Sequence, residues 1–248
     1  MLLFVTFRGF LRVYALQKRL QLWYCSAIDG NIPAATCRYL ILPFLPFMSL
    51  QFALTGGIAC GKSMAEACFA ACGCRVLDAD RVVHQLEAVG GAAVEPIRQV
   101  FGDAVVTAEG AIDRAALAAM VFQEGGARQR LEAILHPLVR QVTADWLAQA
   151  EPNAISVFSA ALLYECGWEG DWQGVVCVAA SRETQVRRMC QVRQMSRAAA
   201  EARLAAQMPL DEKTRRANWI LKNDTDDPEA LQSQVAALVA TWKAHYLS

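Results

Sequence analysis

The chain has 248 residues, of which 55% are hydrophobic and 19% are charged. This composition excludes an intrinsically disordered chain, and the length suits one large domain or two small ones with a substantial core. The 24 basic and 24 acidic side chains cancel, so no overall charge recruits nucleic acid or a membrane surface. We expect an ordinary cytoplasmic enzyme with no nucleic-acid partner and no stable membrane association.

The zero net charge hides a break in composition near Met48. Residues 1–48 carry five basic side chains and one acidic one, whereas the remaining 200 residues carry 19 basic and 23 acidic side chains. The basic segment 1–47 has three interpretations: an organellar presequence, a helix on a membrane surface, or an extension upstream of a natural start at Met48. We favour the third, with the functional domain at 48–248.

The elements expected after Met48 alternate between strand and helix. Short apolar runs predict buried strands at 50–55, 75–77, 154–158, 175–178 and 219–221. Helices are expected at 62–71, through 81–150, over the arginine-rich 183–207, and from Pro228 to about 245. The stretch 81–150 is expected to break at Gly90–Gly91, Gly102–Asp103, Gly125–Gly126 and Pro137. This pattern predicts an α/β fold with a parallel five-stranded sheet covered by helices on both faces.

The nine cysteines are interpreted as reduced thiols. The chain contains three histidines and no paired C-x-x-C clusters, so a zinc site is not expected.

A phosphate-binding loop lies between the first strand and the first helix. Its eight residues fit the P-loop pattern G-x-x-x-x-G-K-[ST]: Gly56-Gly57-Ile58-Ala59-Cys60-Gly61-Lys62-Ser63. The glycines let backbone N–H groups point at an anion, and the helix that follows adds the positive end of its dipole. We expect Lys62 to reach the β- and γ-phosphates of a nucleoside triphosphate and the Ser63 hydroxyl to ligate Mg²⁺. A chance glycine-rich turn is the alternative.

The second strand ends in a pair of aspartates, Asp78 and Asp80. Ligands of open parallel sheets bind beyond the carboxyl ends of the strands, so both carboxylates are expected at the reactive edge. Alternation places them on the same side of the chain while it remains extended. Either could take a proton from an attacking hydroxyl or position Mg²⁺ through water, and either could instead cap the next helix. The guanine-reading pattern N-K-x-D is absent, which favours a small kinase over a GTPase.

The ordered motifs of residues 49–248 resemble the dephospho-CoA kinase family. They are T-G-G-I-A-C-G-K-S at 55–63, L-D-A-D at 77–80, F-G-D at 101–103, I-D-R at 112–114, L-H-P at 135–137 and L-L-Y-E at 162–165. The resemblance implies transfer of a phosphoryl group from ATP to the ribose 3′-hydroxyl of dephospho-CoA, the last step of coenzyme A synthesis. It also implies a helical acceptor-binding region at 81–150 and a helical lid at about 183–207.

The resemblance further assigns roles to single residues. Asp80 would be the general base, Arg114 would hold the charged part of the acceptor, and Arg188 would be the lid arginine that closes on the transferred group. The triphosphate would be lined by the loop and the start of its helix: Gly57, Ile58, Ala59, Cys60, Gly61, Lys62, Ser63 and Met64.

Each of these assignments has a simpler alternative. Arg114 could form a solvated pair with Asp113 at a helix start, and of the adjacent Arg187 and Arg188 only one is expected to reach the site. Glu165 is a secondary candidate for substrate contact.

Two further residues are also secondary. His136 is more readily interpreted as a packed or capping residue than as a catalytic one, and Asn223 after the last strand could approach the adenine.

Several positions depart from the family pattern: Met64 for threonine, Ala161 for proline, Tyr164 for phenylalanine, Val192 for arginine and Asn218 for aspartate. They leave the reaction type unchanged. Two competing hypotheses remain: a P-loop kinase for another small acceptor, such as a nucleoside monophosphate, and a nucleotide-binding regulator whose lid has lost catalytic competence, suggested by Val192.

Overall fold

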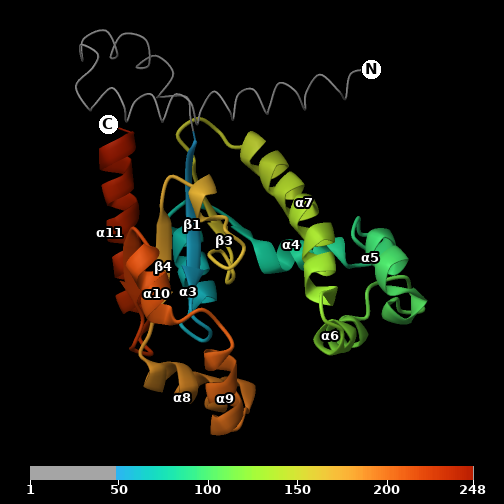
Figure 1. Cartoon of the computed structure of the whole chain (residues 1–248). Helices are drawn as coiled ribbons and strands as arrows, with labels where there is room; N and C mark the ends of the chain where they lie inside the picture. Colours follow the sequence, from blue (N-terminus) through green and yellow to red (C-terminus); the bar gives the residue numbers. More distant parts are fainter. Residues whose placement is uncertain (1–48, 248) are drawn as a thin grey trace, which may run out of the picture. The chain divides into compact units, whose positions relative to one another are not determined.

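A computed structural model describes residues 49–247 of the chain (Figure 1). The expectation about residues 1–47 lies outside the described residues. Within them, the five strands are β1 (Leu50–Gly56), β2 (Arg75–Asp78), β3 (Ile155–Ser159), β4 (Val175–Ala179) and β5 (Trp219–Lys222). Each lies within two residues of its expected position, so the period and the apolar content of these segments were sufficient to locate them.

The strands form one sheet in the order β2-β3-β1-β4-β5, and every pairing is parallel. The expected five-stranded parallel sheet is therefore confirmed. In this order β1 lies in the centre, with β3 on one side and β4 on the other. Because these three strands are parallel, their carboxyl ends lie at the same edge of the sheet. The loop after β1 leaves from this edge, which is where α/β proteins bind ligands.

Helices cover both faces of the sheet. Successive side chains of β1 point to opposite faces, so each face carries apolar side chains that a helical layer buries. Phe52 and Leu54 belong to a core shared with α3 (Lys62–Ala71) and α11 (Pro228–Tyr246), whereas Ala53 belongs to a second core on the other face. On the first face the buried Trp242 stacks on Phe52 with ring centroids 3.8 Å apart. These two cores fix the central strand between two helical layers.

The second core is formed by the helical region between β2 and β3. It contains α4 (Ala79–Leu86), α5 (Val94–Phe101), the short 3₁₀ turn η3 (Asp103–Val105), α6 (Arg114–Gln123) and α7 (Ala127–Ala148). The expected break at Pro137 is wrong, because α7 runs through this residue without interruption. Proline removes the bond to the carbonyl four residues earlier, here that of Ala133. Ala133 and Pro137 both lie on the exposed side of the helix, where water can donate a hydrogen bond to the Ala133 carbonyl.

The segment expected as one helix at 183–207 is two helices. They are α8 (Arg182–Arg193) and α9 (Arg197–Ala205), which pack against each other away from the sheet (Figure 1). The break lies at Gln194, which ends α8 in the left-handed conformation with φ of 52°. A further helix, α10 (Leu210–Arg216), precedes β5 and was not expected. It is too short to show a clear apolar period.

Across residues 49–247, no helix has both the length and the hydrophobicity that crossing a lipid bilayer requires.

Candidate functional site

The loop after β1 has the conformation that a phosphate cradle needs. It turns from Gly56 into α3 at Lys62, with a hydrogen bond from the Cys60 N–H to the Gly57 carbonyl of 3.2 Å. Two residues of the turn adopt positive φ angles, Ala59 with 58° and Gly61 with 93°. Ala59 carries a side chain in a region that L residues rarely adopt, and such strain is often found at binding loops.

Three side chains from distant segments hold the carbonyls of this loop. The Gln185 amide donates to the Ile58 carbonyl at 2.7 Å, and the Asn223 amide donates to the Cys60 carbonyl at 2.8 Å. Arg188 donates to the carbonyl of Ala59 at 3.4 Å. Because the donors satisfy carbonyl groups, they fix the loop without using its N–H groups, which are the groups that bind phosphate.

Neither Gly57 nor Gly61 has room for a side chain. A Cβ on Gly61 would lie 2.1 Å from the Asn223 amide nitrogen, and one on Gly57 would lie 2.7 Å from that of Gln185. These are the same two amides that hold the loop, so the glycines allow the close approach that its anchoring requires.

The Lys62 ammonium lies among oxygen atoms from four elements: α3, β3, β2 and α4. Its Nζ is 2.7 Å from Oε1 of Glu66 and 3.0 Å from the Ser159 hydroxyl. Asp78 and Asp80 lie farther away, at 3.7 Å and 3.9 Å. The structure therefore brings the loop lysine and both predicted aspartates together.

Both aspartates lie near Lys62, but the expected alternation of side chains along an extended strand is not the reason. The chain does not remain extended, because β2 ends at Asp78 and α4 begins at Ala79. The Asp78 carboxylate caps α4 by accepting from the Asp80 N–H at 2.9 Å, as the capping alternative predicted. Asp80 thus stands in the first turn of a helix, and its carboxylate is more exposed than that of Asp78.

The surroundings of Asp80 raise its pKa above the ordinary aspartate value. The largest cause is removal of water from around the carboxylate, and the nearby charges of Asp78 and Glu66 act in the same direction. Lys62 and His84 lower the pKa but do not cancel the rise. A raised pKa makes the carboxylate a stronger base, which suits a group that must accept a proton.

The described residues contain no cluster of three or more His, Cys, Asp or Glu side chains that could hold a metal by themselves. Mg²⁺ does not need such a cluster, since it commonly takes one or two protein oxygens together with phosphate oxygens and water. Ser63 stands exposed in the first turn of α3, directly after Lys62 in the chain. Its hydroxyl is a hard oxygen donor of the kind that fits Mg²⁺. Met64 is also exposed, at 40%, and supplies no oxygen.

Arg114 lies away from the Lys62 cluster, at the start of α6. Asp113 caps this helix, while the Arg114 guanidinium donates to Glu87 at 2.8 Å and lies 2.6 Å from Nε2 of His84. The alternative of a pair with Asp113 is wrong, because Arg114 pairs with the buried Glu87 instead. Arg114 and Glu87 also line a cavity of about 430 Å³ between α6 and α7, whose other walls include Leu117 and Val121.

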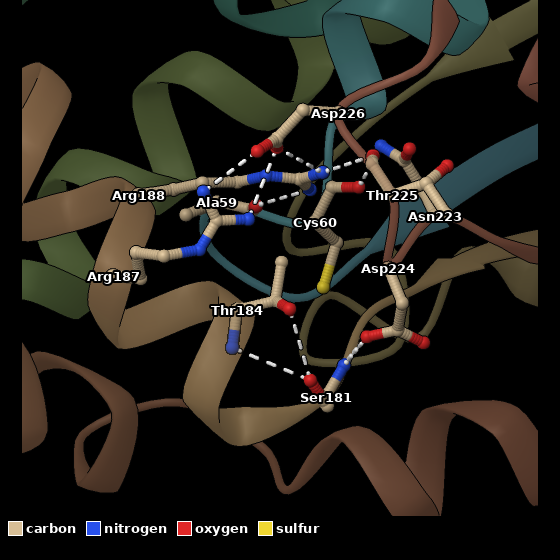
Figure 2. Close-up of polar contacts among 10 residues, drawn as sticks. All are labelled: Ala59, Cys60, Ser181, Thr184, Arg187, Arg188, Asn223, Asp224, Thr225 and Asp226. Atoms are coloured by element: carbon tan, nitrogen blue, oxygen red, sulfur yellow. Dashed lines mark hydrogen bonds and ion pairs between the residues drawn. The ribbon is translucent and has the colours of Figure 1, made fainter.

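Arg188 and Arg187 both bind Asp226, but only one of them contacts the loop (Figure 2). Arg187 makes a bidentate pair with Asp226 at 2.7 Å and 3.0 Å. Arg188 donates to the Thr225 carbonyl at 2.8 Å and lies 3.4 Å from Asp226 and from the Ala59 carbonyl. The Arg187 guanidinium is the main cause that lowers the pKa of Asp226.

The secondary candidates have structural partners. Glu165 pairs at 2.8 Å with Lys213, a fully buried lysine whose ammonium also donates to the Ala161 carbonyl. His136 packs edge-on against Trp168, in agreement with its interpretation as a packed residue. The Asn223 amide holds the phosphate loop, as described above.

The departures from the family pattern have separate surroundings. Tyr164 is buried, and burial raises the pKa of its hydroxyl to about 12. Asn218 accepts a hydrogen bond from the Val175 N–H at 2.8 Å, and Val192 is 79% exposed. The seven cysteines of residues 49–247 are free thiols, and burial raises the pKa of Cys60, inside the phosphate loop, to about 11.

Sequence reasoning missed two residues that contact Lys62 and one that binds Arg187 and Arg188. Glu66 lies four positions after Lys62, so helical spacing alone could have indicated the contact. Ser159 comes 97 residues after Lys62 and Asp226 comes 38 residues after Arg188, so only the folded chain shows these two contacts.

Comparison with known proteins identifies relatives over nearly the whole described region. A family model described as dephospho-CoA kinase matches residues 50–229. The chain is 44% identical over 191 residues to a dephospho-CoA kinase of Anaeromyxobacter dehalogenans, covering 75% of this chain and 89% of the relative. It is 39% identical over 189 residues to that of Geobacter sulfurreducens, covering 75% and 95%.

Solved structures agree with this result. A protein of Thermus thermophilus shares 36% identity and a TM-score of 0.69, covering 78% of this chain and 98% of its own. The dephospho-CoA kinase of Campylobacter jejuni, at 24% identity and a TM-score of 0.52, shares the fold over 78% of this chain and 97% of its own. The matched family model and the identities to these relatives place this chain in the dephospho-CoA kinase family.

Proposed function

We propose that this protein transfers the γ-phosphoryl group of ATP to the ribose 3′-hydroxyl of dephospho-CoA, giving coenzyme A and ADP. One observation carries the proposal most directly: the phosphate-loop lysine, Lys62, lies 3.9 Å from the carboxylate of Asp80 at the carboxyl edge of the sheet. A cation that holds phosphate therefore stands beside a base that can deprotonate an attacking alcohol, which is the pairing that phosphoryl transfer to a hydroxyl requires.

Each residue then has a defined task. Asp80 accepts the proton of the 3′-hydroxyl, and its raised pKa favours that step. Lys62 and the N–H groups of residues 57–64 hold the triphosphate. The Ser63 hydroxyl would hold Mg²⁺, which supplies positive charge to the phosphate oxygens when bound.

The two arginines serve opposite sides of the reaction. Arg188 is already within 3.4 Å of the Ala59 carbonyl, so a small movement of its guanidinium brings it to the phosphates. There its planar cation would stabilise the charge that spreads over the transferred group. Arg114, which lines the cavity between α6 and α7, would bind the charged part of the acceptor.

We also infer how the chain divides its work. Residues 81–150 would form the acceptor-binding region, and about 183–207 would form the lid. The domain 48–248 would be sufficient for activity, so a chain that begins at Met48 should keep its full kcat. A cytoplasmic location would match the free thiols, because that compartment keeps cysteines reduced.

An acceptor panel tests the reaction. ADP release would be measured with dephospho-CoA, AMP and adenosine as acceptors, and mass spectrometry would identify the product. We expect turnover with dephospho-CoA and a product 3′-phosphorylated on its ribose. Turnover with AMP and none with dephospho-CoA would instead support the kinase for another acceptor. ATP binding without transfer to any acceptor would support the regulator.

Variants test the assigned roles. Asp80→Asn and Lys62→Ala should each lower kcat by several orders of magnitude while the circular dichroism spectrum stays unchanged. Lys243→Ala, which removes an exposed lysine of α11, is the matched control and should keep full activity. An Asp80→Asn variant with normal kcat would remove the general-base assignment.

A further inference from the structure

Glu66 is a partly buried carboxylate in the site, and the reaction assigns no task to it. It lies one helical turn after Lys62 on α3, and its Oε1 accepts from the Lys62 ammonium at 2.7 Å and from the Ser159 hydroxyl at 2.5 Å. The side chains of Lys62 and Glu66 are only 13% and 14% exposed. Solvent therefore screens this pair much less than an ordinary pair on a helix surface.

The position of the ammonium shows which partner holds it. Lys62 Nζ is about 1 Å nearer to Glu66 than to Asp78 or Asp80, and the Ser159 hydroxyl bridges Lys62 and Glu66 from the end of β3. The nearest anion to this lysine is thus supplied by the protein itself. Nucleotide phosphates would bind the same ammonium. Its interaction with Glu66 therefore competes with its interaction with the phosphates.

We propose that Glu66 is an internal ligand of Lys62 that competes with the nucleotide phosphates and thereby sets the affinity of the site for ATP. The proposal rests on the proposed function of Lys62 as a phosphate ligand. Glu66 and Ser159 hold the ammonium beside the two aspartates. When ATP binds, Lys62 turns to the phosphates, and Glu66 keeps the hydrogen bond from Ser159.

Glu66→Gln tests the proposal because it removes the charge and keeps the shape. ATP binding would be measured by calorimetry with Mg²⁺ and a non-hydrolysable ATP analogue, without acceptor. We expect Kd to fall about tenfold, equivalent to about 1.4 kcal/mol. Glu132→Gln is the matched control, since Glu132 forms the same i,i+4 pair with Arg128 on an exposed part of α7, and it should leave Kd unchanged.

The outcomes separate this proposal from the proposed function. A Glu66→Gln variant that folds and binds the analogue no more tightly than the natural protein overturns the role of Glu66, even if phosphoryl transfer proceeds. If Glu66→Gln does not fold, the same measurement applies to Glu66→Asp, whose shorter carboxylate should give a smaller decrease in Kd. Absence of phosphoryl transfer in the natural protein counts against the proposed function instead.

Discussion

Lys213 is a fully buried lysine on which the position of the loop after β3 depends. Its ammonium is 2.8 Å from Glu165 and donates to the Ala161 carbonyl at 2.8 Å. The same carbonyl accepts a longer bond of 3.4 Å from the Thr55 hydroxyl of β1. Replacement of Lys213 by methionine keeps most of the volume of the side chain and removes both bonds together with the charge.

The loss of folding free energy in Lys213→Met comes from the Glu165 carboxylate, which is left without its partner. Glu165 is 18% exposed, so its carboxylate would lose its countercharge in a place that water reaches poorly. Removing one partner of a buried ion pair typically costs about 3–5 kcal/mol, whereas replacing both partners with apolar residues is often close to neutral. Lys213→Met should therefore destabilise the fold by about 3 kcal/mol or more, and Lys213→Met with Glu165→Leu should recover at least about 1 kcal/mol of that loss.

Urea denaturation followed by circular dichroism measures these free energies by linear extrapolation. Arg128→Met is the matched control, because the Arg128–Glu132 pair is exposed and should contribute less than about 1 kcal/mol. A Lys213→Met variant that loses less than that would refute the reasoning. A double variant that is less stable than Lys213→Met alone would refute it too, since the uncompensated carboxylate would then not be the source of the cost.

Three further changes test the phosphate loop and the core. Gly61→Ala should raise the Kd for ATP by about a hundredfold or more in a folded protein, because φ is 93° and the added methyl group would lie 2.1 Å from the Asn223 amide; normal binding by calorimetry would contradict this. Trp242→Ala should lower the free energy of unfolding in urea by about 3–5 kcal/mol through loss of its stack on Phe52, without changing kcat. Cys60 should resist iodoacetamide at pH 8 in the native protein, since burial raises its pKa to about 11 and leaves only about one thiol in a thousand ionised; rapid alkylation found by peptide mass spectrometry would count against it.

Local sequence patterns located most of the regular structure. The helix at 62–71 was predicted with the bounds that the structure has, and five apolar runs became the five parallel strands. Such segments are specified by the spacing of apolar residues along the chain, which is a property of neighbouring residues. Pro137 and Gln194 were harder because each depends on what surrounds the helix. An exposed carbonyl tolerates a proline, and the packing of α8 against α9 tolerates a residue in the left-handed conformation between them.

By itself, the sequence determined the phosphate loop, because that function lies in eight consecutive residues whose glycines and lysine have meaning in a strand–loop–helix context. It also indicated Asp78 and Asp80, although by an extended geometry that the chain does not adopt. Only the tertiary structure decided which groups surround Lys62 and Arg188. Ser159 reaches the lysine from 97 residues away, and Asp226 reaches the arginine from 38 residues away. Contacts of this kind depend on how the sheet and the loops bring separate segments together, and no local period encodes them.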